Sequence, residues 1–311
     1  MNIKKDWRHC VSKKILIIGE GSSGKNHLKA LRLIEKKIII KLIPSRKFIK
    51  FTKKNYANLI NYDPDYIIIC SPSSFHYKFI LLIEKLYNNK IVLVEKPLFN
   101  KKQDVSKIKK NKYFVGYNLR HHPVLKFIKD YVMKKDIFFV RSDCFTYLPD
   151  WRNIDYKKTV SAQKKLGGGV LLELSHEIDY LNWIFGNLKI LYSFNKKVSN
   201  LKIDCDDILC LNATNKKNIF INLNLNFFSK IEKREIIING KNFSIYGDIK
   251  NNTITLIEGE KKKVFKYKNY KIMQSYKIES LNLLNKNYST NCTFKEAMIV
   301  QKLIEKIKIS I

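Results

Sequence analysis

Residues 14–24, KILIIGEGSSG, decide the fold of this chain. The first five residues form a short apolar run, which is typical of a fully buried strand. The run is followed by Gly19-Glu20-Gly21-Ser22-Ser23-Gly24, which matches the pattern G-x-G-x-x-G and leads into a helical pattern. In such a turn the three glycines serve the tight bend, the approach of a pyrophosphate and the close packing of helix on strand. The segment therefore predicts a dinucleotide-binding strand-to-helix turn, with a turn that binds no ligand as the alternative.

The remainder of the first half repeats this alternation of strand and helix. Helical spacing continues over residues 23–36 and returns over residues 75–87. Further apolar runs, which predict strands, cover residues 38–43, 65–70, 91–94 and 113–117. Short apolar strands that alternate with helices indicate a doubly wound parallel sheet covered on both faces. We therefore expect an α/β domain of the Rossmann type over residues 1–118.

The second half has a different character, because strand-like runs follow one another directly. These runs cover residues 137–147, 188–198, 208–213, 219–228, 234–238, 243–246, 253–257 and 263–267, and helices are expected at 172–185 and 293–309. Asn239–Gly240 predicts a type I′ hairpin turn, and Asn251–Asn252 is a weaker signal of the same kind. Residues 119–311 are thus expected to form an α+β domain with a large, mostly antiparallel open sheet, packed closely against the first domain.

The chain is strongly basic, with a formal net charge of +33. Such a charge raises the possibility of a nucleic-acid partner. Only seven of the 60 basic residues are Arg, the residue preferred for bidentate recognition of bases and phosphates, and the lysines are scattered along the chain. We therefore expect a charge spread over solvated surfaces and no nucleic-acid partner, with a basic nucleic-acid-binding protein as the less favoured alternative.

The cysteines and the apolar segments bear on location. None of the six cysteines forms a C-x-x-C pair, which favours a reducing compartment. Residues 1–14 carry charge but no apolar h-region, and no stretch approaches the roughly 18 apolar residues that a membrane span needs. These observations predict a cytoplasmic protein without a membrane partner.

The choice of cofactor depends on the residues after the second strand. An acidic residue that binds the ribose 2′-hydroxyl is expected about 20 residues beyond the glycine turn. This chain has Pro44-Ser45-Arg46-Lys47 there. Ser45 and Arg46 could bind a 2′-phosphate, so NADP is slightly favoured over NAD. The alternative is that Arg46 and Lys47 are two more surface cations.

Several further segments fall into one pattern. The third strand ends at Ser71-Pro72-Ser73-Ser74-Phe75-His76, the fourth at Glu95-Lys96-Pro97 and the fifth at Gly116-Tyr117-Asn118-Leu119-Arg120; Gly167-Gly168-Gly169 then leads to Glu173-Leu174-Ser175-His176-Glu177-Ile178-Asp179. With these segments the chain resembles the Gfo/Idh/MocA oxidoreductases, from about residue 14 to the C-terminal helix. The Glu-Lys-Pro tripeptide after a buried strand is the most specific part of the resemblance.

The resemblance implies an NAD(P)-dependent dehydrogenase or reductase. It would transfer a hydride between the nicotinamide and a hydroxyl or keto carbon of a sugar derivative, at a site between the two domains. Residues 148–152 and the Ser-His-Glu-Ile-Asp helix resemble members that act on amino or deoxy sugars in surface glycan synthesis. Members are usually dimers or tetramers formed through the open sheet. The expected cofactor-binding residues are Gly19, Gly21, Ser22, Ser23, Gly24, Ser45, Arg46, Ser71, Pro72, Ser73, His76, Glu95, Lys96 and Asn118.

Lys96 and His176 are the expected catalytic residues. Oxidation of an alcohol needs a proton acceptor beside the hydride acceptor, and a neutral lysine at the carboxyl end of a strand can take this role. Glu173, His176 and Asp179 follow at three-residue intervals and are predicted to share a helix face. Inositol-dehydrogenase-like members carry an Asp four residues before the His, but position 172 is Leu here. Either the helix start is shifted, so that Glu173 orients His176, or Asp179 does.

Other residues are expected to bind the substrate. These are Lys96, Arg120, Trp151, Arg152, Tyr156, Glu173, His176 and Asp179. A stacking aromatic and a guanidinium suit a sugar that carries a carboxylate or phosphate, although an aromatic that merely anchors the loop is the alternative for Trp151. Gly167-Gly168-Gly169 permits either a close approach or a flexible turn.

Two further possibilities concern metal and turnover. Glu173-x-x-His176 is half of a di-iron helix motif, but the chain has no second copy, so we expect no metal. The altered spacing before His176 leaves open a protein of the same fold that binds the dinucleotide with little or no catalysis.

Overall fold

The computed structural model describes residues 12–34, 37–49 and 53–309. Cys10 and most of residues 1–14, on which the expectation of no secretory signal depends, lie outside this part of the chain. So do the last two residues of the helix expected at 23–36. Within the described part, no helix combines the length and the apolar character that crossing a membrane would require.

The first sheet contains six strands in the order β14-β5-β4-β3-β1-β2. The strands are β1 (Lys14–Ile18), β2 (Ile39–Ile43), β3 (Tyr66–Ile69), β4 (Ile91–Val94), β5 (Lys112–Val115) and β14 (Cys292–Thr293). All pairs are parallel except that of β14 with β5. The side chains of β3 are buried along its whole length, as a sheet covered on both faces requires. The predicted Rossmann domain is confirmed, with a short antiparallel strand added at one edge.

The helices of this domain place its crevice. They are α1 (Ser22–Arg32), α2 (Ser45–Ile49), α3 (Lys53–Tyr62) and α4 (Ser73–Leu86). The chain passes from β1 through α1 to β2 on one side, and β3 then pairs with the other side of β1. Strand order thus reverses at β1, and ligands bind outside the carboxyl ends of the strands at such a point.

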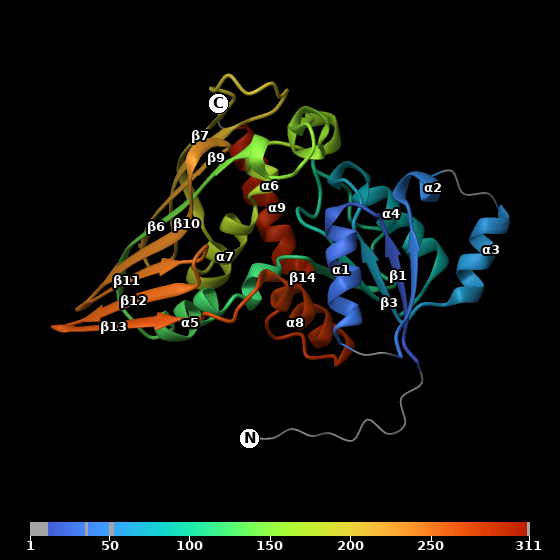
Figure 1. Cartoon of the computed structure of the whole chain (residues 1–311), viewed down its shortest axis with the longest axis horizontal. Coiled ribbons are helices and arrows are strands. Elements are labelled where there is room, and N and C mark those ends of the chain that lie inside the picture. The colour runs from blue at the N-terminus through green and yellow to red at the C-terminus, as the bar shows by residue number, and fades with distance from the viewer. Residues whose placement is uncertain (1–11, 35–36, 50–52, 310–311) are drawn as a thin grey trace.

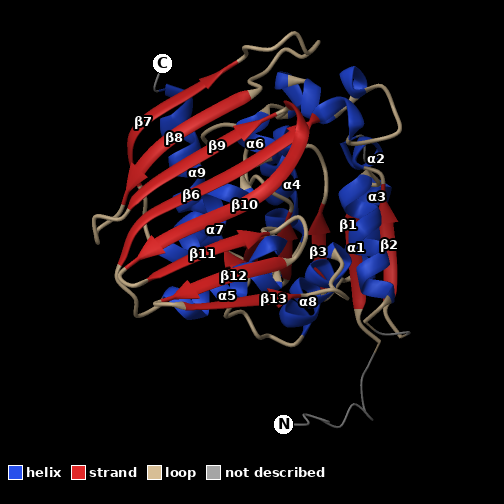
Figure 2. Cartoon of the chain, turned by 60° about the vertical axis from the view of Figure 1, so that its left-hand side comes forward, coloured by secondary structure: helices blue, strands red, loops and turns tan. Residues whose placement is uncertain are grey.

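The second sheet contains eight strands in the order β13-β12-β11-β10-β6-β9-β8-β7 (Figure 2). They are β6 (Ile137–Tyr147), β7 (Lys189–Lys196), β8 (Ile208–Thr214), β9 (Phe220–Asn226), β10 (Phe228–Gly240), β11 (Phe243–Asp248), β12 (Thr253–Glu258) and β13 (Lys261–Lys266). Only the pair β6–β9 is parallel. The predicted mostly antiparallel open sheet is therefore confirmed.

Helices cover one face of this sheet. They are α5 (Pro123–Val132), α6 (Val170–Glu173), α7 (His176–Phe185) and α9 (Phe294–Ile309), between the sheet and the Rossmann domain (Figure 1). Strand β8 shows the consequence, because Leu209, Leu211 and Ala213 are buried and the residues between them are half-buried. The sheet thus has one core face and one face without helices.

The last part of the chain returns to the Rossmann domain. Helix α8 (Ile272–Leu284) packs along α1, and β14 extends the first sheet beside β5 (Figure 1). Residues 272–293 therefore contact the first domain although they lie beyond the predicted boundary between residues 118 and 119.

The hairpin expected at Asn239–Gly240 is displaced by two residues. Both residues lie in β10, and the turn consists of Lys241 and Asn242, where Asn242 has a φ of 63°. A Cβ on Gly240 would lie 2.4 Å from the carbonyl oxygen of Asp136, so this glycine serves a close approach rather than the turn. The weaker turn signal is correctly placed, because Asn252 has a φ of 58° between β11 and β12.

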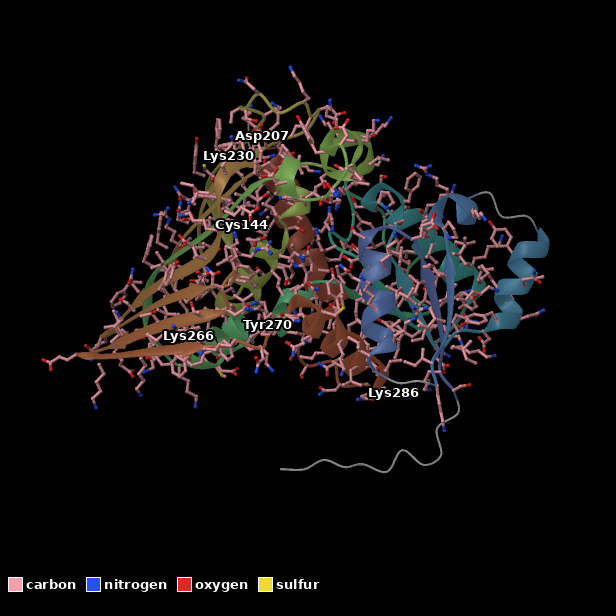
Figure 3. The ribbon with its side chains drawn as sticks, viewed as in Figure 1. Cys144, Asp207, Lys230, Lys266, Tyr270 and Lys286 are labelled. Atoms are coloured by element: carbon pink, nitrogen blue, oxygen red, sulfur yellow. The ribbon has the colours of Figure 1, made fainter. Side chains whose placement is uncertain are left out.

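The lysines are distributed over distant parts of the molecule. Figure 3 shows three of them far apart on the molecule: Lys230 in β10, Lys266 in β13 and Lys286 after α8.

Candidate active site

The glycine turn is shaped by close backbone contacts. Gly19 has a φ of +119°, and a Cβ there would lie 2.4 Å from the carbonyl oxygen of Cys70. A Cβ on Gly24 would lie 2.0 Å from the carbonyl oxygen of Gly19. At Gly21 an added Cβ would meet nothing within 4 Å. Gly19 and Gly24 are thus required by packing, and Gly21 leaves the backbone at the start of α1 open to a ligand.

A cleft of about 490 Å³ lies over this turn, between the two domains. The carboxyl ends of β1, β2, β3 and β4 supply one side of it, and the segment 152–160 and Glu173 supply the other. The predicted site residues that line it are Gly21, Ser22, Ser23, Ser45, Arg46, Ser71, Pro72, Ser73, Glu95, Lys96, Arg152 and Glu173. Glu20, Cys70, Pro97, Ile154, Lys158, Thr159 and Val160 complete the lining, and the sequence did not single these out as site residues.

Two of the predicted cofactor-binding residues lie behind the cleft. His76 is fully buried, with Nε2 2.9 Å from the carbonyl oxygen of Ser71 and Nδ1 3.0 Å from that of Pro97. It therefore ties the loop after β3 to the loop after β4, and burial lowers the pKa of its ring. Asn118 is only 4% exposed, in the 3-10 turn η1 (Asn118–His121), and does not line the cleft.

Glu95 is held by a residue that the sequence analysis missed. Nε2 of His27, in α1, lies 2.8 Å from Oε1 of Glu95, and Oε2 accepts the backbone N–H of Lys96 at 3.1 Å. Burial alone would raise the pKa of the Glu95 carboxyl, but the hydrogen bond from His27 and the charge of Lys96 lower it below its usual range. In the sequence, His27 is a histidine on the helix that follows the glycine turn, but its partner Glu95 is 68 residues away.

Lys96 reaches from the first domain to the second. The peptide bond between Lys96 and Pro97 is cis, as the resemblance suggested. Nζ of Lys96 donates a hydrogen bond of 2.7 Å to the backbone carbonyl of Glu173. The Glu173 carboxylate instead accepts a hydrogen bond of 3.1 Å from Oγ of Ser161. The two domains therefore meet at the amine that the sequence predicts to be catalytic.

His176 lies beside this contact but not on one helix with Glu173. Helix α6 ends at Glu173, Leu174 leaves the helical region with φ −100° and ψ 29°, and α7 begins at His176. The expected single helix over residues 172–185, with Glu173 and His176 on one face, is therefore wrong. The His176 ring packs edge-on against Tyr117 at 5.7 Å, and its Nδ1 has no hydrogen-bond partner among the residues that the structure describes.

The charge state of His176 follows from its surroundings. Burial, together with the positive charges of Lys96 and Arg234, lowers the pKa of its ring well below the usual range. The ring is therefore neutral near pH 7.

Within the described residues, no cluster of three or more His, Cys, Asp and Glu side chains could hold a metal ion.

Arg120 and Asp179 pair with each other rather than with the cleft. Nε and Nη2 of Arg120 donate to the two carboxylate oxygens of Asp179 at 2.9 and 2.7 Å, and Nη1 donates to Glu296 at 2.8 Å. Both Arg120 and Asp179 are 1% exposed. The expectation that Asp179 orients His176 is thus corrected, because the carboxylate is fully engaged by the guanidinium.

The loop after β6 brings only one of its three predicted residues to the cleft. Arg152 lines the cleft. The indole N–H of Trp151 donates to Oγ1 of Thr146, and the ring packs edge-on against Phe227 at 5.0 Å. The hydroxyl of Tyr156 accepts the backbone N–H of Lys202 at 3.0 Å. Trp151 and Tyr156 therefore anchor the loop, and the anchoring alternative for Trp151 holds.

The triple glycine serves a close approach. A Cβ on Gly168 would lie 2.4 Å from the carbonyl oxygen of Val160, and one on Gly169, at φ +107°, would lie 2.4 Å from Oδ1 of Asp206. A Cβ on Gly167 would overlap Oγ of Ser73 at 1.9 Å. The glycines thus let the chain before α6 approach Ser73 of α4, the backbone at Val160 and the side chain of Asp206, which favours close approach over a flexible turn.

Comparison with known proteins bears on this arrangement. The model of the oxidoreductase family with an NAD-binding Rossmann fold, GFO_IDH_MocA, matches residues 13–112, and that of the oxidoreductase-family C-terminal alpha/beta domain matches residues 135–311. A search of the curated proteins found no match.

Solved structures share the fold at low sequence identity. The WlbA dehydrogenase from Bordetella pertussis, in complex with NADH and UDP-GlcNAcA, is 15% identical with a TM-score of 0.78 over 96% of this chain and 95% of its own. UDP-N-acetylglucosamine 3-dehydrogenase GnnA from Acidithiobacillus ferrooxidans is 13% identical with a TM-score of 0.74 over 97% and 98%. A dehydrogenase (MviM) from Clostridium difficile is 20% identical with a TM-score of 0.73 over 96% and 99%.

Proposed function

The chain belongs to the Gfo/Idh/MocA family of NAD-binding oxidoreductases, and on this premise we propose that it transfers a hydride between the nicotinamide and a hydroxyl or keto carbon of a sugar derivative. The observation that carries the proposal is the position of Lys96. Its amine lies in the interdomain cleft, above the glycine turn, and contacts the second domain at Glu173.

The residues of the cleft fit a dinucleotide. The open space at Gly21 and the N-terminus of α1 would receive the pyrophosphate, with Ser22 and Ser23 beside it. When bound, the nicotinamide supplies the hydride acceptor or donor. The protein must then hold the substrate carbon against the ring and move one proton.

Lys96 and His176 are suited to the proton. The amine of Lys96 can accept the hydroxyl proton in oxidation and return it in reduction. We propose that the neutral ring of His176, which lies beside Lys96 but is not among the residues that line the cleft, hydrogen-bonds the substrate oxygen without adding a charge beside Lys96. Asp179 takes no part in this step, because Arg120 engages its carboxylate.

The cofactor preference remains slightly in favour of NADP over NAD. Ser45 and Arg46 line the cleft directly after β2, where an NAD-specific fingerprint would carry a carboxylate. Substitution Arg46→Ala should weaken NADP binding and leave NAD binding unchanged, with the exposed Lys47→Ala as a matched control. Unchanged NADP affinity in Arg46→Ala would remove this preference.

The substrate is proposed to be a sugar that carries a carboxylate or phosphate, as in amino-sugar or surface-glycan synthesis. Arg152 and Lys158 bring two positive charges to the second-domain side of the cleft. The solved relatives named above include a dehydrogenase bound to UDP-GlcNAcA and a UDP-N-acetylglucosamine 3-dehydrogenase, which supports nucleotide sugars as the first class to test.

The test combines cofactor release with turnover. The dinucleotide freed by denaturing the purified protein would be identified, and a panel of nucleotide sugars would be screened for the absorbance change of the nicotinamide. Lys96→Ala should abolish turnover while the dinucleotide still binds, and the exposed Lys102→Ala should behave as wild type. Near-normal turnover of Lys96→Ala would refute the role of Lys96, and binding without turnover of any sugar would favour the non-catalytic alternative.

A homo-oligomer, a dimer or tetramer, is proposed through the face of the second sheet that carries no helices. Phe139 and Phe220 stack on this face at 6.2 Å, and Phe220, Ile257 and Val264 are 41%, 43% and 51% exposed. Light scattering of wild type and Val264→Glu would test this surface. The cytoplasmic location and the absence of a nucleic-acid partner stay predictions.

A further inference from the structure

One buried side-chain contact connects the helix of the dinucleotide turn with the loop of the proposed catalytic lysine. His27 lies in α1, three residues after Gly24, and is fully buried. Its Nε2 is 2.8 Å from Oε1 of Glu95, and Oε2 of Glu95 accepts the backbone N–H of Lys96. The contact therefore joins the helix after the glycine turn to the backbone at Lys96.

We propose that His27 is a positioning residue, which acts through Glu95 to hold Lys96 in register with the dinucleotide turn. The inference rests on the proposed function, in which Lys96 and the nicotinamide act on the same carbon. A displacement of about 1 Å between reacting groups can cost about a hundredfold in rate, so the benefit of such a contact falls on turnover rather than on binding.

The second ring nitrogen identifies the form of His27. Nδ1 is buried and has no hydrogen-bond partner among the residues that the structure describes. A single proton on Nδ1 would be buried without an acceptor and would leave Nε2 facing Oε1 with no hydrogen between them, so Nε2 carries a proton. His27 then donates to Oε1, and the negative charge stays on Glu95. The ring is fixed in this orientation by the edge of Tyr276 from α8, at 4.9 Å and 87°.

Burial opposes the ionisation of Glu95, and several other ionisable groups lie around it. Besides His27 and Lys96, the ionisable groups that face it are His76 on α4, Cys70, Tyr66 on β3, and Tyr276 and Glu279 on α8. Burial, together with the nearby Glu95 charge, raises the pKa of the Glu279 carboxyl well above its usual range. Without His27, Glu95 would keep only Lys96 to balance the cost of its burial.

Glu95 also has little room to find another partner. A Cβ on Gly116 would lie 3.4 Å from both Cδ and Oε2 of Glu95, so β5 packs directly against the carboxylate. If Glu95 became neutral, one of its oxygens would carry a proton. This proton would compete with the backbone N–H of Lys96 for space and for the lone pairs of the Glu95 oxygens. The backbone at Lys96 would then lose an acceptor that is charged in the native protein.

Three substitutions separate positioning from packing. His27→Phe keeps a buried ring and removes the donor, whereas His27→Gln keeps an N–H donor within reach of Oε1. Glu95→Gln keeps the shape and the acceptor for His27, but its amide nitrogen cannot accept from Lys96. All three would be compared with wild type at matched folded fractions, verified by circular dichroism.

Steady-state kinetics give the first readout. We expect kcat of His27→Phe and Glu95→Gln to fall by about tenfold to a hundredfold, as the loss of a charge-assisted hydrogen bond implies. For His27→Phe, a position that does not line the cleft, the dissociation constant of the dinucleotide should change by less than about threefold, because the open glycine turn does not involve the His27 side chain. His27→Gln should recover most of kcat. Equal losses in the Phe and Gln variants would overturn the proposal in favour of ring packing, and so would an unchanged kcat in His27→Phe.

The second readout needs no turnover and so separates this inference from the proposed function. The rate at which an amine-reactive reagent acylates Lys96 would be measured by mass spectrometry of the peptide that contains Lys96. The wild-type holoprotein would be compared with His27→Phe and His27→Gln. We expect faster labelling in His27→Phe, because Nζ loses its fixed hydrogen bond to Glu173, and a near wild-type rate in His27→Gln. Identical rates in all three proteins would refute the positioning role, even if no substrate were found.

Discussion

Replacement of Asp179 tests whether its role is structural or catalytic. Asp179 accepts two hydrogen bonds from Arg120, at 2.9 and 2.7 Å, and both side chains are almost completely buried. Burial raises the pKa of the Asp179 carboxyl, and the Arg120 guanidinium opposes this rise by favouring the charged form. If Asp179 is removed, Arg120 keeps only Glu296, whose side chain is 37% exposed.

The structure indicates how large the effect should be. Removing one partner of a buried ion pair costs about 3–5 kcal/mol, because the other charge is left buried without compensation. We expect Asp179→Ala to lie near the lower end of this range, since Glu296 still accepts one bond. We expect a smaller loss for Glu296→Gln, because its side chain is 37% exposed and the amide oxygen can still accept a hydrogen bond from Arg120.

Urea unfolding followed by circular dichroism measures this difference. Asp179→Ala should lower the midpoint by about 1 M, and Glu296→Gln, as the matched control, should change it only slightly. Asp179→Asn should also destabilise, while the affinity for the dinucleotide is retained in the folded fraction. A variant Asp179→Asn that keeps wild-type stability but loses turnover would refute the structural role and restore Asp179 as the partner of His176.

Three further predictions follow from the cofactor turn, a buried histidine and the net charge. Gly24→Ala should destabilise the protein by about 1–3 kcal/mol in urea unfolding, because its Cβ would overlap the carbonyl oxygen of Gly19. Gly21→Ala should weaken dinucleotide binding without loss of stability. Equal stability of the two variants would contradict the packing argument. Burial, with the charges of Lys126 and Arg120, lowers the pKa of His121 to about 3. In the unfolded state the ring has its ordinary pKa of about 6.5, so it binds a proton that the folded state does not bind. The free energy of unfolding should therefore fall as pH drops from about 6.5 towards 3, by up to about 1.4 kcal/mol per pH unit. His121→Phe should reduce this slope, and an unchanged slope would refute the assignment. Binding to DNA should vanish at moderate salt and show no sequence preference; retention that survives saturating dinucleotide and is lost on charge reversal of a lysine cluster would instead support a nucleic-acid partner.

The strands of the first domain were predictable because they are buried on both faces. The bounds of β1 and β4 agree with the apolar runs in the sequence, and β6 in the second sheet agrees as well. Helix α8 was missed for a physical reason. Its buried face carries Ser275, Glu279 and Ser280 together with Leu283, so the apolar periodicity that identifies a helix is absent.

The site was predictable where one segment carries its own signal. The glycine turn and Glu95-Lys96-Pro97 are local patterns, and the structure brings them to one cleft. His27, Asp179 and Trp151 were misjudged or missed because their roles depend on partners that only the folded chain supplies. A buried carboxylate near a histidine in sequence can belong to a distant arginine, as Asp179 does.

The contact between Lys96 and Glu173 explains how the altered spacing before His176 remains compatible with catalysis. The break after Glu173 turns its backbone carbonyl, rather than its carboxylate, toward Nζ of Lys96. A carbonyl oxygen accepts a hydrogen from the amine in either protonation state, whereas a carboxylate would favour the ammonium form. The carbonyl therefore orients the amine, and the Glu173 carboxylate is held away by Ser161. In the proposed reaction, Lys96 and a neutral His176 would therefore handle the proton without a carboxylate between them.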